Sequence, residues 1–580
     1  MNRFDRESIG TYPQPNFRRE NWQDLNGVWE FDFDDDDRGM HERWQEQHIY
    51  SRTITVPFCY QSRLSGLHDL TYHPYVWYRR TFQYKLETGS LLLHFGAVDY
   101  RCKVWINGQF AGEHIGGHTS FWFDISLFVH TGENELVLRA EDTGSCQQPR
   151  GKQVWHNEEP TRCWYTPTTG IWQNVWLEYT GHCYTDLIHI TPDPDNRCAQ
   201  MFVRWPEHQT PDQIHVRVWR GETVVADELR ACSGDRIRLS VAIPEQDPVY
   251  DLHCWSPKHP TLYDVEITLF SYSRQEDTVY TYFGMRKIEC RNGLILLNNK
   301  PIYQKLILDQ GYWPDSLLTP PDLHSLRDDL ALMQAMGFNG VRKHQKIEDP
   351  RFYYWADVFG MLVWEEMPSF YEFTERSVEH FLSEWREAIS RDYNHPSVIT
   401  WVPFNESWGL RNIYSSKQQQ DFAASVYYLT KTIDNTRLVQ INDGWEQLSV
   451  SDLCGIHDYR VSSADMLDKY RNLTRLLKQD AAGTMLYCQG SAWQGQPVIL
   501  SEFGGISCGA PGSWGYHKHV AQADALVEQY GALVKALRAI PDIQGFCYTQ
   551  FTDVMQEMNG LLYADHTPKI DIRKIAAYNT

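Results

Sequence analysis

Short runs of alternating apolar and polar residues fill the chain between about Trp22 and Tyr179. Such runs, separated by turn residues, are typical of β-strands that bury one face. No stretch of helical period and of any length interrupts them, so we expect an all-β sandwich. Its strand candidates are GVWEFDF, SRTITVP, VWYRRTFQY, SLLLHFGAV, CKVWING, NELVLRAED and IWQNVWLEY.

A second β-rich stretch follows, from about Asp186 to Met285. Its clearest strand candidates are IHVRVWRG, IRLSVAIP and LYDVEITLF. A length of about 100 residues fits a small immunoglobulin-like sandwich. We therefore place two sandwiches in series, over residues 1–181 and 182–284.

From residue 285 to 580 the pattern changes to strands that alternate with helices. Eight alternating pairs over about 290 residues predict a (β/α)8 barrel, also called a TIM barrel. A doubly wound open sheet is the alternative, but it would more often carry a glycine-rich turn after its first strand, and LILDQGYW is not one. Helix candidates are Asp322–Met336, Arg376–Tyr393, Lys417–Ile433 and Ala521–Ala539, and strand candidates are PIYQKLIL, GFNGVRKH, GMLVWEEM, SVITWVPF, RLVQIND, DLCGIHDY, PVILSEF and IQGFCYTQF.

Two of these predicted strands end in acidic side chains. The run from Val398 to Phe404 is apolar except for Thr400, and it leads directly into Asn405 and Glu406. The stretch QPVILSEFGG has the same construction and leads to Glu502. A carboxylate at the end of a buried strand is costly unless it faces a cleft, and in an α/β barrel the carboxyl ends of the strands form that cleft.

The other predicted strands also end in polar groups. Any one of them could be a capping or salt-bridging residue. Eight polar strand ends in register, however, would place their side chains around one cleft at the carboxyl ends of the strands. These groups are Asp309, His344, Glu365, Glu366, Asn405, Glu406, Asn442, Asp443, His457 to Tyr459, Glu502, and Tyr548 to Gln550.

Paired carboxylates point to the hydrolysis of glycosides. One carboxyl group must be protonated to donate to the departing oxygen, and the other must be ionised to attack or to activate water. Glu406 and Glu502 end the fourth and seventh predicted strands, on opposite sides of an eight-stranded ring, so their side chains could meet across its mouth.

Composition narrows the classes of partner. The net charge of −21 argues against nucleic acid and anionic membranes. No apolar run reaches membrane-spanning length, and the sequence MNRFDRESIG lacks the apolar segment of a signal peptide. Thirteen dispersed cysteines without metal-ligand spacing fit reduced thiols, so we expect a cytoplasmic protein.

Three long motifs resemble glycoside hydrolase family 2, the β-galactosidase and β-glucuronidase family. RDYNHPSVITWVPFNESWG is similar to its acid/base signature, and the segment Gly337–Pro368 resembles its other signature. TTGIWQNVWLE resembles the segment that closes its sugar-binding jelly roll. The resemblance covers the whole chain in domain order. It implies a jelly roll, an immunoglobulin-like sandwich and a catalytic barrel, and a retaining hydrolase that needs no metal for its chemistry, so no cofactor is expected.

The resemblance also implies roles for single residues. Glu406 matches the general acid/base, and Glu502 the nucleophile. Asn405 would bond the sugar 2-hydroxyl, and Tyr459 would hydrogen-bond the nucleophile. The remaining matches are substrate contacts: His344 facing the glycone, Glu366 helping to hold it, and Tyr548 where many members have a tryptophan under the sugar, with Asp309 as a further strand-end candidate.

The sugar itself is less clearly indicated. β-Glucuronidases carry an Asn-x-Lys pair near the last strand, where this chain has Glu557 and Asn559. An acid there would repel a uronate carboxylate, which disfavours glucuronidase. β-Galactosidase is the leading choice, ahead of other β-glycosidases of the family. Lys343 or Lys346 could serve a uronate by another route, so galacturonidase and glucuronidase stay open as alternatives.

Two rivals belong to other classes. One is a carbohydrate-binding protein without activity, against which the presence of both glutamates and Asn405 argues. The other is a transglycosidase that delivers the sugar to another acceptor. Because family members are often dimers or tetramers, a homo-oligomer is also expected.

Overall fold

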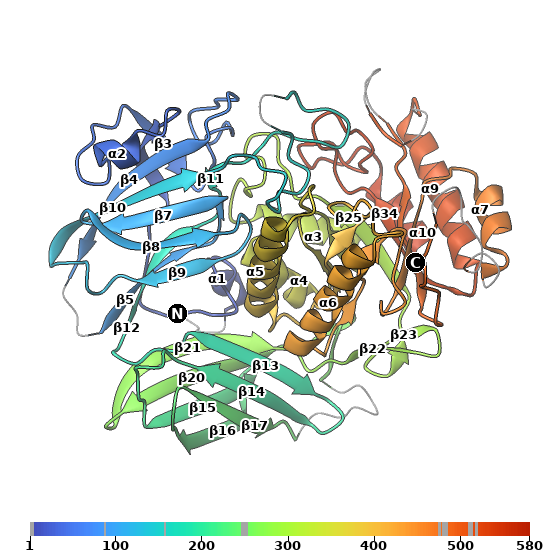
Figure 1. Ribbon diagram of the computed structural model, residues 1–580. Helices are drawn as coiled ribbons and strands as arrows, with labels where there is room; N and C mark the ends of the chain where they lie inside the picture. The colour runs from blue at the N-terminus through green and yellow to red at the C-terminus, as the bar shows by residue number, and fades with distance from the viewer. Residues whose placement is uncertain are drawn as a thin grey trace.

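The computed structural model describes residues 5–85, 89–155, 158–244, 253–473, 477, 485–508, 514–516 and 520–580. Two β-sandwiches pack against one α/β barrel (Figure 1). The first sandwich, blue to cyan, lies on one side of the barrel, and the second, green, lies below both.

The first sandwich has two antiparallel main sheets. Trp29, Phe31, Tyr78, Leu93 and Leu177 are buried in its core. Its structure adds three strands to the main sheets that the sequence did not indicate, Trp22–Asp24, Gln109–Ile115 and Phe121–Asp124. The four-stranded sheet runs β1 (Trp22–Asp24), β12 (Val175–Thr180), β5 (Ser90–Phe95) and β9 (Phe121–Asp124), and the six-stranded sheet runs β3 (Arg52–Val56), β2 (Gly27–Phe33), β4 (Tyr75–Tyr84), β10 (Gly132–Glu141), β7 (Arg101–Ile106) and β8 (Gln109–Ile115).

Short elements complete this part of the chain. They are α1 (Arg6–Ile9), α2 (Gly39–Glu42) and the two-stranded pair of β6 (Val98–Asp99) and β11 (Gly170–Ile171). The chain between β10 and β11 forms a long connection that reaches the barrel.

The second sandwich also pairs two antiparallel sheets. Ile190, Val216, Val265 and Val279 are among the residues of its core. One sheet runs β13 (Leu187–Asp193), β14 (Cys198–Arg204) and β17 (Arg236–Ala242), and the other runs β16 (Thr223–Ala231), β15 (Gln213–Arg220), β20 (Tyr263–Ser271) and β21 (Arg274–Phe283). Small strands between this sandwich and the barrel are β18 (Trp255–Ser256), β19 (His259–Pro260), β22 (Ile288–Arg291), β23 (Leu294–Leu297) and β24 (Lys300–Pro301).

The barrel has one eight-stranded sheet, and it confirms the predicted (β/α)8 class. Its first strand pairs in parallel with both the second and the last, so the sheet curls into a ring. The strands are β25 (Gln304–Asp309), β26 (Gly340–Lys343), β27 (Leu362–Glu366), β28 (Val398–Val402), β30 (Leu438–Val439), β32 (Cys454–Asp458), β33 (Val498–Gly504) and β34 (Ile543–Thr549). A separate parallel pair, β29 (Phe404–Asn405) and β31 (Asn442–Asp443), lies just beyond β28 and β30.

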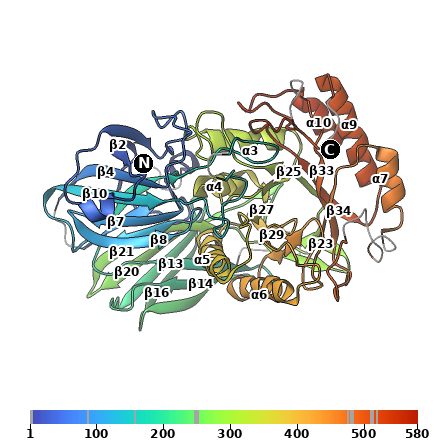
Figure 2. The ribbon, with the colours of Figure 1, turned by 45° about the horizontal axis from the view of Figure 1, so that its top comes forward.

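Helices surround this sheet (Figure 2). Local signals set their ends: Asp349 caps α4 before Pro350, and Thr374 and Ser377 form a capping box at α5. The helices are α3 (Ser325–Ala335), α4 (Pro350–Phe359), α5 (Glu375–Asp392), α6 (Lys417–Ile433), α7 (Ser463–Tyr470), α9 (Ala523–Arg538) and α10 (Ile572–Asn579). None of these described helices is both long enough and apolar enough to cross a bilayer.

The first sandwich is fastened to the mouth of the barrel through the connection between β10 and β11. The backbone N–H groups of Arg150 and Gly151 donate to the Ser369 carbonyl, at 3.0 and 3.1 Å. The Tyr371 hydroxyl donates to the Gly151 carbonyl at 2.6 Å. These bonds bring residue 152 to the carboxyl ends of the barrel strands.

Candidate active site

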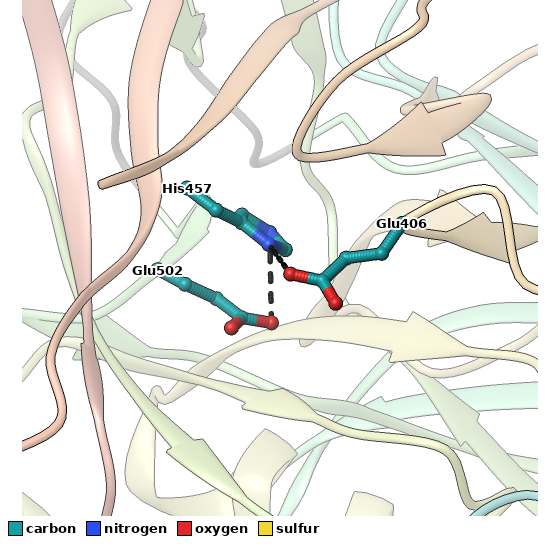
Figure 3. A group of neighbouring side chains, drawn as sticks. All are labelled: Glu406, His457 and Glu502. Carbon is teal, nitrogen blue, oxygen red and sulfur yellow. Dashed lines mark hydrogen bonds and ion pairs between the residues drawn. The ribbon is translucent and has the colours of Figure 1, made fainter. Parts of the chain in front are cut away.

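Glu406 and Glu502 meet at the mouth of the barrel, as expected from the strand ends. Glu406 directly follows β29, and Glu502 lies in β33. Their carboxylates approach each other from two sides, with His457 of β32 next to both (Figure 3). A carboxylate oxygen of Glu406 and one of Glu502 lie within 4.8 Å of each other.

The surroundings of Glu502 favour its ionised form. Its carboxylate accepts a hydrogen bond from the Tyr459 hydroxyl, and its Oε1 lies 2.9 Å from Arg342 Nη1. Burial raises the pKa of Glu502, but the charges of His457 and Arg342 outweigh burial and lower it. An ionised carboxylate fixed by two donors is suited to nucleophilic attack.

Glu406 is held differently. Its Oε1 lies 2.7 Å from His457 Nδ1, and its Oε2 has no partner among the described residues. Its side chain is 18% exposed, against 4% for Glu502. Glu406 and Ser407 both have left-handed backbone, with φ of 51° and 59°, so the chain turns sharply after β29. One oxygen of Glu406 therefore remains open to an incoming group.

Arg342 of β26 is the central cation of the site, and sequence reasoning gave it no role of its own. Its guanidinium is fully buried and lies 2.8 Å from Asp443 and 2.5 Å from Glu366. It also donates to Asn405 Oδ1 at 2.8 Å. That bond fixes the amide of Asn405 and leaves its Nδ2 without a partner among the described residues, which is the orientation that donation to a sugar hydroxyl requires.

His457 is the second residue that sequence reasoning left without a role. It pairs with Glu502 in the register of β32 and β33, so the two side chains stand at the same level. Its Nε2 lies 3.1 Å from Asp443 Oδ2 and 3.5 Å from Glu502 Oε1. Burial lowers the pKa of His457, but the charges of Glu502 and Asp443 raise it to about 10. The imidazole is therefore positively charged at neutral pH.

Glu406, His457 and Glu502 are also the one group among the described residues whose spacing could chelate a metal ion. Arg342 Nη1, however, lies 3.4 Å from His457 Nε2 and 2.9 Å from Glu502 Oε1. The Arg342 guanidinium thus already places a positive charge beside His457 and Glu502. These three side chains therefore fit a metal ion poorly.

His344 and Glu366 lie beside the central cation. His344 Nδ1 is 2.9 Å from Glu366 Oε1, and burial lowers the pKa of His344 well below its usual value, which keeps the ring neutral. The oxygens of Glu366 accept from Arg342 and from Gln345. Glu366 therefore positions the guanidinium and the turn after β26, and contact with the glycone stays a prediction.

Tyr548 does not lie under the sugar site, which corrects the sequence interpretation. Its ring packs against Phe503 and against Tyr530 of α9, at centroid distances of 5.5 and 5.0 Å, on the helix side of the sheet. Because side chains alternate along a strand, its neighbour Thr549 faces the mouth instead. The Tyr459 hydroxyl lies 3.4 Å from Thr549 Oγ1.

Asp309 and the two lysines after β26 form a separate buried ion cluster. Lys343 Nζ lies 2.6 Å from Asp309 and 2.7 Å from Glu348. Lys346 contacts Glu348 and donates to the carbonyls of Gly311 and Leu318. Both ammonium groups are thus already bound by carboxylates or carbonyls, so neither lysine is available to bind a uronate. Asp309 is held in an ion pair with Lys343.

A lysine from the first sandwich reaches the site in their place. Lys152 is 5% exposed, its Nζ forms no ion pair with a described residue, and it lies 5.9 Å from the centre of the Trp408 ring. Burial lowers the pKa of Lys152, but Glu557, Cys163, Glu502 and Glu406 raise it overall, so the ammonium stays charged. Nothing in the sequence indicates this residue, because its place depends on contacts between two domains.

Glu557 lies buried close to this lysine. It accepts hydrogen bonds from the Tyr165 hydroxyl and from Asn559 Nδ2, the latter at 3.1 Å. The carboxylate that the sequence placed near the last strand is thus part of the site's wall and is bonded to the first sandwich.

Comparisons with known families match the three parts of the chain. Residues 22–147 match "Glycosyl hydrolases family 2, sugar binding domain", residues 185–286 match "Glycosyl hydrolases family 2", and residues 288–579 match "Glycosyl hydrolases family 2, TIM barrel domain". The last match alone covers half of the chain.

Individual relatives carry several different names. A β-galactosidase of Thermoanaerobacter pseudethanolicus is 25% identical over 68% of this chain and 52% of its own length. A β-glucuronidase of Streptococcus agalactiae is 24% identical over 67% of this chain and 66% of its own length. The chain spans about half the length of several curated relatives that it matches.

Solved structures share the fold along nearly the whole chain. A β-galacturonidase from Eisenbergiella tayi bound to glycerol has a TM-score of 0.75 and 21% identity, with 97% of both chains covered. The β-glucuronidase of Ruminococcus gnavus has a TM-score of 0.80 and 18% identity, with 98% of this chain and 99% of that chain covered.

Proposed function

The chain belongs to glycosyl hydrolase family 2, and on this premise we propose that it is a retaining exo-β-glycosidase. Glu502 would be the nucleophile and Glu406 the general acid/base. Its substrates would be carbohydrates with a terminal β-linked sugar.

The separation of the two carboxylates carries this proposal. Retaining glycosidases have their two carboxyl groups about 5–5.5 Å apart, whereas inverting ones leave about 6.5–9.5 Å for a water molecule. Oxygens of Glu406 and Glu502 within 4.8 Å of each other support the retaining arrangement.

In the first step of the proposed mechanism, Glu502 attacks the anomeric carbon while Glu406 protonates the departing oxygen. Arg342 and Tyr459 hold the attacking carboxylate in place. Asn405, fixed by Arg342, would bond the 2-hydroxyl, a contact that strengthens in the transition state.

In the second step, Glu406 acts as a base and removes a proton from water, which attacks the glycosyl-enzyme. The C1–Oε bond breaks, Glu502 regains its charge, and the sugar leaves with its original configuration. Transfer to another acceptor would use the same intermediate, and added acceptor sugars would reveal it as a second product.

A β-galactoside is the first candidate substrate. Glu557 is fully buried in the wall, and its carboxylate would repel an acidic sugar. A neutral hexose meets no such penalty.

A β-uronide, galacturonide or glucuronide, is the second candidate, because Lys152 brings a positive charge to the same wall. The ammonium lies over the Trp408 ring and forms no ion pair with a described residue, and a uronate carboxylate would supply the opposite charge.

The test is a panel of 4-nitrophenyl β-glycosides, with galactoside, glucuronide, galacturonide, mannoside and glucoside, read together with the anomer of the first product by NMR. We expect turnover of a terminal β-glycoside with a β-configured first product, and Glu502→Gln should lower kcat at least about a thousandfold. An α-configured first product, or a Glu502→Gln enzyme with normal turnover, would exclude the mechanism. A protein that binds the sugars and turns over none of them would be a binding protein.

A further inference from the structure

We propose that His457 stores the catalytic proton in the resting enzyme and passes it to Glu406 when the glycosidic bond breaks. The inference rests on the proposed roles of Glu406 and Glu502. It makes His457 a positioning residue that acts through Glu406, and it adds a proton reservoir to the two-carboxylate scheme.

The geometry that carries this inference is a chain of three side chains. His457 Nδ1 lies 2.7 Å from Glu406 Oε1, and its Nε2 lies 3.5 Å from Glu502 Oε1 (Figure 3). The ring is fully buried, so solvent does not compete for either nitrogen. One imidazole therefore joins the two carboxylates through opposite ring atoms.

Charged groups face this ring from every strand packed around it. Glu406 follows β29, Asp443 ends β31, and Glu502 lies in β33. Among the described residues, Arg342 of β26 is the one cation in contact, with Nη1 3.4 Å from Nε2. His344, which also follows β26, is kept neutral by burial. Three carboxylates against one guanidinium favour a protonated ring, in line with the pKa of about 10 for His457.

The charge of Glu502 links proton storage to the chemical step. When Glu502 attacks C1 its carboxylate becomes an ester, and one of the negative charges that hold the proton on His457 disappears. Coulombic attraction at 3.5 Å in a buried site is large on the scale of thermal energy. The ring therefore releases its proton most readily at the moment when the leaving group needs it.

The Nδ1–H bond of His457 breaks as an O–H bond forms on Glu406, and Glu406 gives a proton to the departing oxygen as the C1–O bond breaks. In the second step, water gives a proton to Glu406 as its oxygen bonds to C1. Glu502 leaves as a carboxylate, and the proton returns to Nδ1.

Two variants, His457→Asn and His457→Gln, test the proposal through the leaving group and the pH profile. For a phenyl or methyl glycoside, kcat/KM should fall about 10²-fold, the lower end of what acid catalysis contributes. For the 2,4-dinitrophenyl glycoside, which needs no acid, it should stay within about threefold. For the phenyl or methyl glycoside, the high-pH limb of the kcat/KM profile should move at least one pH unit lower. The reason is that a carboxyl group alone gives up its proton at lower pH than an imidazolium does.

Equal losses on both substrates would overturn the proposal, as would a basic limb that stays or moves to higher pH. The matched control is His395→Asn, because His395 is also fully buried beside an acid, Asp357, at 2.6 Å but far from the mouth. It should alter thermal stability and leave the shape of the pH profile unchanged.

A measurement on the wild-type protein guards against variants that do not fold. A 2,4-dinitrophenyl 2-deoxy-2-fluoro glycoside converts Glu502 to an ester and releases dinitrophenolate, which takes up no proton above pH 6. An unbuffered indicator assay at pH 9 should then record the release of up to one proton per trapped enzyme. Trapping without proton release anywhere between pH 7 and 10 would overturn the inference, whereas failure to trap at all would count against the proposed function.

Discussion

Single charges decide how this site can work. A guanidinium and an imidazolium lie between the carboxylates of Glu366, Asp443, Glu502 and Glu406, and each buried charge has an opposite charge within 4 Å. Lys152 differs, since its ammonium forms no ion pair with a described residue and lies instead over the Trp408 ring, 5.9 Å from the ring centre. The unpaired cation marks the point where a ligand group with negative charge would gain most.

Replacement of this lysine tests the choice between the two classes of sugar. If the substrate is a β-uronide, Lys152→Met should lower kcat/KM for it about 10- to 100-fold, the loss of one charge-assisted hydrogen bond. Activity on a β-galactoside should change less than about threefold. The control is Lys85→Met, an exposed lysine of the same sandwich. Equal changes in kcat/KM on both sugars would show that Lys152 does not recognise the uronate carboxylate.

At the scale of elements, the connection between β10 and β11 decides whether Lys152 reaches the site. Gly151 has a φ of 63°, and a Cβ added there would lie 2.6 Å from the Gln345 carbonyl oxygen. The residue must therefore be glycine both for its backbone conformation and for the close approach.

Gly151→Ala should displace this connection from the barrel mouth. We expect a loss of about 1–3 kcal/mol of stability from overpacking, and at least a tenfold lower kcat/KM on the best substrate. Gly132→Ala is the matched control, since Gly132 also has positive φ but a Cβ there would meet nothing within 4 Å. It should lose some stability and keep its activity. A Gly151→Ala enzyme as active as this control would contradict the account.

Elements with a strong local pattern of apolar and polar residues could be predicted from the sequence, and elements that depend on distant contacts could not. GVWEFDF became β2 at Gly27–Phe33, and the helix expected at Lys417–Ile433 has those bounds, because local periodicity is strong in both. The helix at Pro350–Phe359 was missed, since buried residues occupy nearly every position and no polar face marks it. Tyr548 was placed on the wrong side of β34, because a one-residue shift reverses the face.

Long-range contacts hid the rest of the site. Arg342 and His457 lie in the predicted strands GFNGVRKH and DLCGIHDY, but only the folded sheet brings them together between carboxylates of other strands. Lys152 comes from a different domain altogether.

At the scale of the whole molecule, buried ion pairs join the parts of the chain. Arg19 contacts Glu178 of β12 in the first sandwich and lies 2.9 Å from Asp277 of β21 in the second. All three side chains are at most 3% exposed. The orientation of the two sandwiches therefore depends on one guanidinium.

Arg19→Met should destabilise the protein by about 3–5 kcal/mol, because it leaves two buried carboxylates without their cation. The control Arg38→Met removes an exposed pair with Asp36 and should change stability by less than about 1 kcal/mol. Urea unfolding monitored by tryptophan fluorescence measures both. Equal midpoints for the two variants would show that the buried pairs do not hold the domains together.

The central claim is that Glu502 forms a covalent bond with the sugar while Glu406 faces it across the mouth. Trapping with a 2-deoxy-2-fluoro glycoside of the sugar selected by the panel, followed by peptide mapping by mass spectrometry, tests it most directly. The account predicts one fluoroglycosyl group per chain, attached at Glu502. An enzyme that turns over its substrate but carries the label on another residue, or accumulates none, would contradict it.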